Sequence, residues 1–173
     1  SMESSFSNVS LKFIHRFIPE FFNIGGSASG SISFNGTSKK THFSYDININ
    51  KPEFELVKMH SLTSKGSYDG KNLELENVYA KNENGYLSAS GYIPFDLNIG
   101  SDNFGKFFID KPINLKSKAD LSDLPFLSPY ITDLDSADGN YKINLNIEGL
   151  INNLKRDGDI VIQNGVLHTQ LLN

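Results

Sequence analysis

The chain has 173 residues, of which 38% are hydrophobic and 12% aromatic, and its formal net charge is −4. This length and apolar content suit a single folded domain and exclude a disordered chain. No basic run is longer than two residues, as at Lys39 with Lys40, and there is no cysteine. The sequence therefore disfavours nucleic acid and anionic membrane surfaces as partners and excludes disulfides and thiolate metal sites.

The ends of the sequence bear on its origin. No stretch approaches the roughly 18 consecutive apolar residues of a membrane-spanning helix, and the N-terminus lacks the basic and apolar regions of a signal peptide. Ser1 and Met2 look like the remnant of a cleaved expression tag. We therefore interpret residues 3–173 as one β-rich segment of a longer protein, whose targeting and anchoring parts lie outside this sequence.

Residues 9–22 predict a short helix. Apolar residues recur there at spacings of three and four, which places them on one helical face: Leu11, Ile14, Phe17, Ile18 and Phe21. Pro19 should kink this helix or end it early.

From Ser27 the apolar period changes to two, which predicts strands with one apolar and one solvated face. A turn at residues 35–37 precedes the clearest run, and Lys51 with Pro52 should break that run. Its apolar positions are Phe43, Tyr45, Ile47 and Ile49.

Two hairpins follow. Asp69-Gly70 and Asn84-Gly85 each predict a type I′ turn between antiparallel strands. Pro94 should end the strand after the second turn, and residues 95–108 predict a loop or a short helix. Alternation resumes at Ile113.

The C-terminal part begins with residues 121–135, which predict a turn or two of helix limited by Pro125 and Pro129. Alternating strands follow at residues 141–147 and 160–166, with a turn-rich connection between them. About eight or nine strands emerge along the chain. The predicted fold class is mainly β, antiparallel, with one or two short helices.

A weak internal repeat relates the two halves of the chain. With an offset of 113 residues, five of the 26 positions from 11 to 36 are identical, and the apolar positions keep their spacing. The identities are Leu11 with Leu124, Phe13 with Phe126, Ile18 with Ile131, Gly26 with Gly139, and Gly36 with Gly149. Preserved pattern at modest identity indicates a repeated structural unit. We expect a first unit at 9–120 and the start of a second at 121–173.

Several phrases in this order resemble the repeating units of TamB and its AsmA-like relatives. They are GSASGSISF at 26–34, SKGSYDGKNLELENVY at 64–79, LSASGYIPFDL at 87–97, and the stretch 121–165. The family's "sG-x-iP" phrase is matched by Ser90, Gly91, Tyr92, Ile93 and Pro94, and its "G-x-i-x-l-x-n-G" phrase by Gly158, Ile160, Ile162, Asn164 and Gly165. The chain departs from the family after Gly149, where Leu154, Lys155 and Arg156 replace the usual proline.

The resemblance implies an elongated, curved antiparallel sheet, a half-pipe or gutter of the β-taco kind. It implies a non-catalytic segment without cofactor, held in the periplasm and anchored to the inner membrane by a part outside this sequence. The expected roles are phospholipid transport between the inner and outer membranes, outer-membrane protein assembly, or both. The expected partners are phospholipid acyl chains and, through regions outside this sequence, an outer-membrane barrel assembly protein.

The gutter needs a continuous apolar stripe, because acyl chains are satisfied by apolar side chains without directional bonds. Ordinary core packing is the alternative role for each residue of such a stripe. Our candidates for a lipid groove are Phe43, Tyr45, Ile47, Leu73, Leu75, Leu87, Ile113, Leu115, Ile143, Leu145, Ile147, Ile160 and Ile162. We expect the stripe to continue beyond Asn173.

Catalytic and metal motifs give no signal. The four histidines (His15, His42, His60 and His168) are far apart in the sequence, and none stands at ligand spacing from another. The GSASG at 26–30 has Ala28 where a nucleophilic serine would stand, so we assign it to a turn. Asp133, Asp135, Asp138 and Gly139 miss the spacing of a calcium loop and predict a solvated acidic turn.

Two alternatives to the gutter remain open from the sequence. One is a β-sandwich adhesion or protein-interaction module of a surface protein, in which two sheets bury their apolar faces against each other. The other is a hydrolase on a β scaffold, which would need convergent polar groups that the sequence does not indicate.

Overall fold

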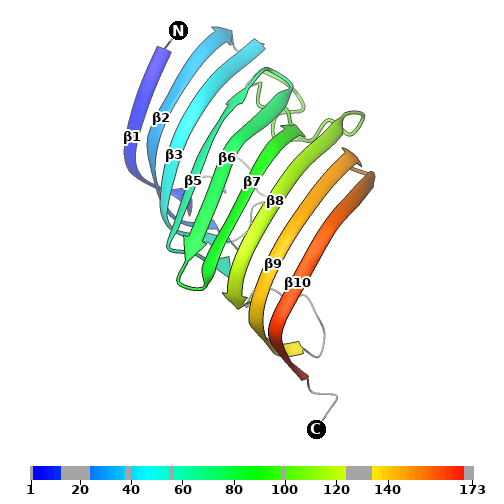
Figure 1. Cartoon of the computed structure of the whole chain (residues 1–173). Coiled ribbons are helices and arrows are strands. Elements are labelled where there is room, and N and C mark those ends of the chain that lie inside the picture. Colours follow the sequence, from blue (N-terminus) through cyan, green and yellow to red (C-terminus); the bar gives the residue numbers. More distant parts are fainter. Residues whose placement is uncertain are drawn as a thin grey trace.

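The computed structural model describes residues 2–12, 24–37, 40–54, 57–98, 100–123 and 134–169. This part of the chain forms one open, curved antiparallel sheet (Figure 1), and its only helical residues are Leu11 and Lys12 in a 3₁₀ turn. The predicted fold class, a mainly β curved antiparallel sheet, is therefore confirmed. The predicted helices are not found in the described residues.

The strands follow one another in space as they do in the sequence. The order is β1-β2-β3-β5-β6-β7-β8-β9-β10, every neighbouring pair is antiparallel, and the short β4 pairs with the end of β3. The bounds are β1 Met2–Ser10, β2 Ile24–Thr37, β3 Lys40–Phe54, β4 Val57–Lys58, β5 Ser61–Tyr68, β6 Asn72–Asn82, β7 Gly85–Pro94, β8 Pro112–Asp123, β9 Leu134–Leu150 and β10 Asn153–Thr169.

The two faces of the sheet differ sharply in polarity. On β3, Phe43, Tyr45, Ile47 and Ile49 lie on one face and alternate with Ser44, Asp46, Asn48 and Asn50 on the other. Because directly paired residues share a face, the registers carry this division from β1 to β10. We call the apolar side the inner face and the polar side the outer face.

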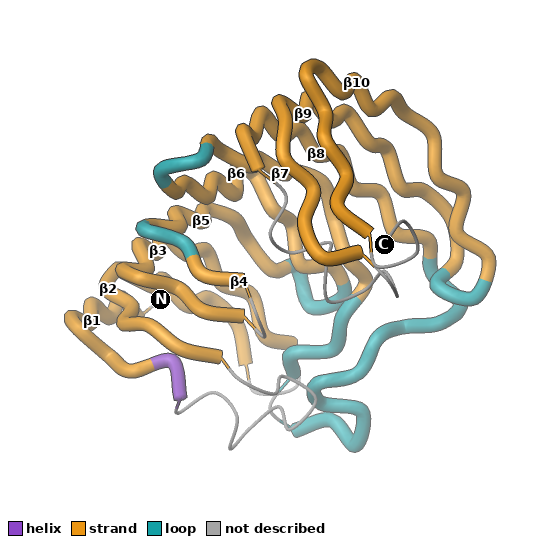
Figure 2. Tube along the Cα trace, turned by 90° about the horizontal axis from the view of Figure 1, so that it is seen from below, coloured by secondary structure: helices purple, strands orange, loops and turns teal. Residues whose placement is uncertain are grey.

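The sheet arches across its strands when it is viewed along them (Figure 2). The connection between β7 and β8 lies on the hollow side of the arch, and it contacts the inner-face residue Tyr68 through a hydrogen bond from the Leu97 N–H to the Tyr68 hydroxyl (2.9 Å). The inner, apolar face is therefore the concave one.

Small residues recur across the middle of the inner face in one cross-strand row, which we call the floor row. Its members, in spatial order, are Gly30, Ile47, Ser64, Val78, Ala89, Ser117, Leu145 and Gly158. Small residues stand between the large ones in this row, so the bulky side chains have room where the sheet bends.

Two glycines in the row next to the floor row, Gly66 and Gly91, show why some inner-face positions carry no side chain. A Cβ on Gly66 would run into the carbonyl oxygen of Glu74 and would lie 2.8 Å from the Tyr45 hydroxyl. A Cβ on Gly91 would run into the carbonyl oxygen of Asn114, and the φ of Gly91 is +135°. The backbones approach closely at these points, which only glycine permits.

The 113-residue offset also relates two parts of the structure. In β1–β2, Met2 pairs with Phe34, and in β8–β9 the residues 113 positions later, Leu115 and Ile147, pair in the same way. Likewise Ile47 pairs with Gly30, as Ile160 pairs with Ile143. The three strands β1–β3 and the three strands β8–β10 thus share one register.

The same offset relates the irregularities. The β2–β3 ladder shifts at Gly26, which has a φ of +104°, and the β9–β10 ladder shifts at Gly139, which has a φ of +139°. Opposite these glycines stand Lys51 and Asn164, two of the three non-glycine residues with positive φ in the described part of the chain. Matching bulges at matching positions indicate that one local geometry is built twice.

Most of both predicted helices lies outside the described residues. Of residues 9–22, Val9 and Ser10 belong to β1, because Val9 pairs with Ala28 and continues the ladder, Leu11 and Lys12 form a 3₁₀ turn, and residues 13–22 lie outside the described residues. Of residues 121–135, the ends belong to β8 and β9, and residues 124–133 lie outside the described part.

Both predicted hairpins are confirmed, but their turn type is wrong. A type I′ turn needs positive φ at both central residues, and Gly70 is the only residue of the β5–β6 turn with positive φ. The carboxylate of Asp69 accepts the N–H groups of Lys71 and Asn72 (2.8 and 2.6 Å) and fixes that turn instead. In the β6–β7 hairpin the turn residues are 83 and 84, and Gly85 already belongs to β7.

Two predicted breaks are absent. Lys51 and Pro52 do not end β3, which continues to Phe54, because the bulge at Lys51 absorbs the irregularity and the Pro52 carbonyl accepts the N–H of Met59 (3.0 Å). The turn-rich connection expected after residue 147 is a turn of only Ile151 and Asn152, and residues 153–159 are already strand.

Substitution of Gly91 tests the close approach of the backbones. We expect Gly91→Ala to lower the free energy of unfolding by about 2–4 kcal/mol, since it adds backbone strain of about 1–3 kcal/mol and a steric overlap of similar size. Gly105→Ala is the matched control: Gly105 has a φ of +81°, but no atom lies within 4 Å of the position that an alanine methyl group would occupy. It should cost about 1 kcal/mol. Urea unfolding followed by circular dichroism measures both, and equal losses would contradict the overlap.

Candidate apolar groove

The structure places all thirteen predicted groove residues on the inner face. They belong to the floor row or to the two rows on either side of it, as the cross-strand registers show. Ile113 is buried, Ile160 and Ile162 on the edge strand are 65% and 56% exposed, and the other ten are half-buried. The sequence thus identified residues that share one surface, although it did not show what that surface binds.

Other inner-face residues were not among the candidates. The register adds Ile32, Phe34, Ile49, Leu62, Tyr68, Val78, Ile93, Leu121 and Tyr141. Most continue an alternation already present in the sequence and could have been found by extending it. Tyr68 could not, because the stretch before it shows no clean period.

An aromatic wall bounds the inner face on the side of the β2–β3 and β5–β6 turns. The rings of Phe34 and Phe43 lie 5.8 Å apart between centroids, and those of Phe43 and Tyr68 lie 5.3 Å apart and are stacked. Tyr68 is only 2% exposed. Such ring pairs add stability beyond their buried area and hold the wall rigid.

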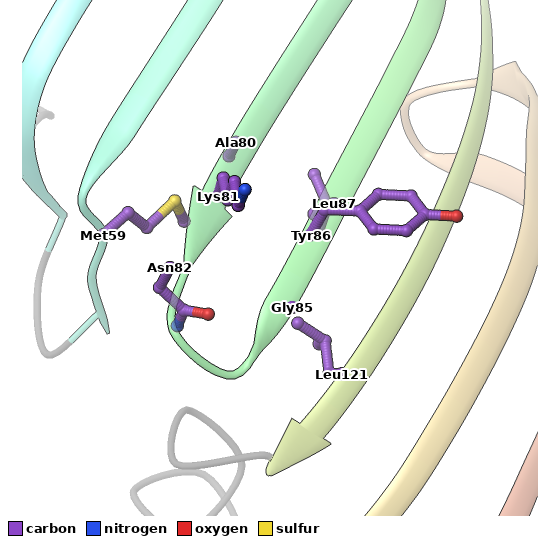
Figure 3. A pocket seen from close by; sticks show the side chains of 8 residues that line it. All are labelled: Met59, Ala80, Lys81, Asn82, Gly85, Tyr86, Leu87 and Leu121. Carbon is purple, nitrogen blue, oxygen red and sulfur yellow. The ribbon is translucent and has the colours of Figure 1, made fainter.

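The opposite wall combines aliphatic residues with one tyrosine. Ala119, Leu121 and Tyr141 form a buried cluster, and Leu87 and Ile143 pack against it. A small hollow of about 40 Å³ opens beside this cluster at the β6–β7 hairpin (Figure 3). Its lining is Met59, Ala80, Lys81, Asn82, Gly85, Tyr86, Leu87 and Leu121.

The polar groups on the floor are satisfied locally. The Ser64 hydroxyl donates to the Tyr45 hydroxyl (3.2 Å), and the Ser117 hydroxyl donates to the Leu145 carbonyl (3.5 Å). Burial raises the pKa of Tyr45, so the phenol is neutral at physiological pH. The bulges at Gly26 and Gly139 bound the regular part of the sheet. Within that part, Arg156 is the one charged residue on the inner face among the described residues. The inner face therefore offers a ligand a mainly apolar surface.

The connection between β7 and β8, residues 95–111, covers one end of the inner face, and we call it the strap. Asn98 holds it: its amide oxygen accepts the Thr41 N–H (3.0 Å), and its amide nitrogen donates to the Gly70 carbonyl (3.0 Å) and to the Tyr68 hydroxyl (3.2 Å). Phe95 and Phe107 pack edge to face at 5.0 Å within the strap. The strap thus joins the start of β3, the end of β5 and the β5–β6 turn over the aromatic wall.

Asp96 organises the strap from inside. Its side chain is 4% exposed and accepts hydrogen bonds from the Ser101 hydroxyl (2.6 Å) and from the backbone and side-chain amides of Asn98 (both 2.9 Å). Burial raises the pKa of this carboxyl, but the hydrogen bonds outweigh burial and hold the pKa below its ordinary value. Because these hydrogen bonds all lie within the strap, the Asp96 carboxylate stabilises the conformation of this loop.

Several sequence motifs find structural roles or lie outside the described residues. The GSASG at 26–30 lies in β2 and the residues from 134 to 140 in β9, so both are strand where we predicted turns; Asp133 and His15 lie outside the described residues. The described residues bring no three histidines or carboxylates together in a group that could hold a metal ion. They also contain no helix with the length and apolarity needed to cross a membrane.

No protein-family model, curated protein or solved structure matches this chain. The resemblance to TamB and the AsmA-like proteins therefore rests on the sequence phrases alone.

The strap generates a pH prediction. Because the folded-state pKa of Asp96 is depressed, its contribution to stability is present above the unfolded value of about 3.9 and is lost as the pH falls through the folded value. We expect wild type and Asp96→Asn to differ in unfolding free energy by a constant amount above about pH 5 and by less below about pH 4. Urea titrations from pH 7 to pH 3 measure this, with exposed Asp102→Asn on the same loop as control. A difference that stays constant down to pH 3 would contradict the depressed pKa.

Proposed function

We propose that this chain is a non-catalytic segment of an envelope protein of the TamB and AsmA-like kind, whose inner face carries phospholipid acyl chains between the inner and outer membranes. The observation that carries the proposal is the apolar inner face, continuous over nine paired strands of one open sheet. A sheet face of this kind must be covered by another layer, close on itself or accept an apolar ligand.

The floor row supports the third outcome. The eight strands that contribute to this row, spaced about 4.8 Å apart, extend about 34 Å across the sheet. One acyl chain occupies about 15 Å, half the hydrocarbon thickness of a bilayer. The row is therefore longer than one acyl chain, and a lipid lying along it would meet only weak, non-directional contacts as it moved.

The strap favours movement along the floor. It covers one end of the strands over Tyr68. Among the described residues no strand lies beyond β1 or β10, so the uncovered directions in this part of the chain run across the strands toward those two edges. Arg156 lies on β10, where its positive charge would suit a lipid phosphate. A phospholipid with its acyl chains on the inner face and its headgroup in solvent would pass beside this side chain.

The resemblance supports the cellular setting of the proposal. It implies a periplasmic protein, with an inner-membrane anchor outside this sequence and a role in outer-membrane protein assembly beside or instead of lipid transport. The β-sandwich alternative needs two facing sheets, whereas the described residues form one. A surface adhesion module of that architecture is therefore not favoured.

Paired substitutions on the two faces of β9 test the lipid groove. Leu145→Gln with Ile147→Gln changes the inner face, and Asn144→Gln with Asn146→Gln changes the outer face of the same strand. We expect wild type and the outer-face variant to bind phospholipid from vesicles in native mass spectrometry. The inner-face variant should bind about thirtyfold less, because two apolar contacts worth about 1 kcal/mol each are lost.

Circular dichroism and urea unfolding must show that the inner-face variant is folded, since an apolar-to-polar change can cost roughly 1–3 kcal/mol of stability. Equal lipid binding by both variants, or no binding by wild type, would end the proposal.

A further inference from the structure

The strap carries exposed apolar side chains close together at residues 104–109, which we call the strap tip. Phe104, Phe107 and Ile109 are 38%, 45% and 66% exposed. At Gly105 no atom lies within 4 Å of the position that a methyl group would occupy, so the tip borders open solvent. Single exposed apolar residues are common on proteins, whereas a group of them on one loop marks an interaction surface.

The strap tip has a fixed backbone conformation. The Gly105 N–H donates to the Asp96 carbonyl (2.8 Å), and the Asp96 N–H donates to the Lys106 carbonyl (2.9 Å). The ring of Phe107 packs edge to face on Phe95, which is buried. Because the loop is ordered before any contact forms, binding through its tip costs little backbone entropy.

The charges at and beside the strap tip cancel. Asp102 and Asp110 are balanced by Lys106 and Lys111. The Lys111 ammonium lies 4.5 Å from the centroid of the Phe108 ring. A lysine has an apolar stem and a charged end, which suits the boundary between water and an apolar phase. Apolar contact, and not net charge, is therefore what this loop offers a partner.

The size of the patch decides between a protein and a lipid surface. A fully exposed side chain of this kind presents about 200 Å², so the three exposed fractions amount to about 300 Å². A standard protein interface buries about 800 Å² on each partner and needs a surface of matching shape. The interfacial region of a bilayer has no fixed shape and accepts small apolar groups, aromatic rings among them. The patch therefore fits a lipid surface.

We propose that the strap tip docks on the surface of a lipid bilayer with zwitterionic headgroups. Phe104, Phe107 and Ile109 lie between the headgroups and the acyl chains, and the ammonium groups of the two lysines stay at the level of the headgroup phosphates. Docking brings the covered end of the inner face to the bilayer, since the strap lies over Tyr68. The contact depends on the strap alone and does not require that the inner face carries lipid.

Tryptophan reporters test the docking, because the chain contains no tryptophan of its own. Ile109→Trp places a reporter on the strap tip, and Tyr92→Trp places one on the outer face, where Tyr92 is 38% exposed. With phosphatidylcholine vesicles we expect the emission of Ile109→Trp to shift to shorter wavelength and to be quenched by bromine on the acyl chains. The emission of Tyr92→Trp should not change. The response should be equal at low and high salt, since the charges of the loop cancel.

Three outcomes of the reporter experiment would overturn the proposal. The first is an Ile109→Trp emission that vesicles leave unchanged, or that responds no more than Tyr92→Trp. The second is a response that needs anionic lipid and disappears at high salt, which would indicate a charge contact. The third is a shift that appears when the protein alone is concentrated, which would mean that the strap tip contacts a second copy.

Sedimentation with the same vesicles gives a second measurement. Phe104→Ser with Ile109→Ser should lower the partition coefficient by at least about tenfold, because binding scales with the apolar area that is buried. Asp102→Ser with Lys106→Ser is the matched control, since it changes two exposed residues of the same loop and leaves the net charge unchanged. Equal losses in both variants would contradict an apolar contact. Circular dichroism checks the fold, and if the first variant does not fold, the reporters decide alone.

The inner-face variant separates docking from lipid carriage. Leu145→Gln with Ile147→Gln keeps the strap, so it should sediment with vesicles like wild type while it binds less lipid in native mass spectrometry. Conversely, Phe104→Ser with Ile109→Ser should still bind a short-chain phosphatidylcholine that is supplied as monomers. Loss of vesicle binding in the folded inner-face variant would show that the inner face holds the vesicles, and would overturn docking through the strap.

Discussion

The structure depends on keeping one alternation in phase across nine strands. A strand presents every second residue to the same face, so a slip of one residue would turn its apolar set toward solvent. The bulge in β6 shows how phase is kept: Leu75 and Val78 are three residues apart, yet both lie on the inner face because Gly66 pairs with Leu75 and Ser64 with Val78. The extra residue is accommodated locally, and the apolar face continues without interruption.

Curvature and apolarity are linked through residue size. A concave face brings neighbouring side chains closer together than a flat one, and uniform large residues would overfill it. The floor row resolves this by placing Gly30, Ser64, Ala89 and Gly158 among larger neighbours. The glycines are conspicuous in the sequence as turn signals, but in the structure Gly66, Gly91 and Gly158 lie within strands and permit close backbone approach.

The sequence predicted the fold class, the two hairpins and the face shared by the groove candidates, because period two is a strong local signal. It missed β1, whose nine residues include four serines and only Met2, Phe6 and Val9 as large apolar positions. It placed turns at the glycines near residues 149 and 158, since a glycine used for a turn and one used for close approach look the same in one dimension. For the strap, the sequence predicted only a loop or a short helix. Its hydrogen bonds join Asn98 to Thr41, 57 residues away, and no local pattern reports such a contact.

The meander order of the strands has a consequence for how the chain folds. Each long strand pairs with its neighbours in the sequence, and no described strand from one end must find a partner at the other. Loop closure therefore involves short separations, which favours fast folding for a β protein. Hairpins can form in turn from the N-terminus and add to a growing edge, much as repeat proteins propagate from one unit to the next. A chain that emerges end first could build its sheet as it appears, with one temporary edge at a time exposed to aggregation.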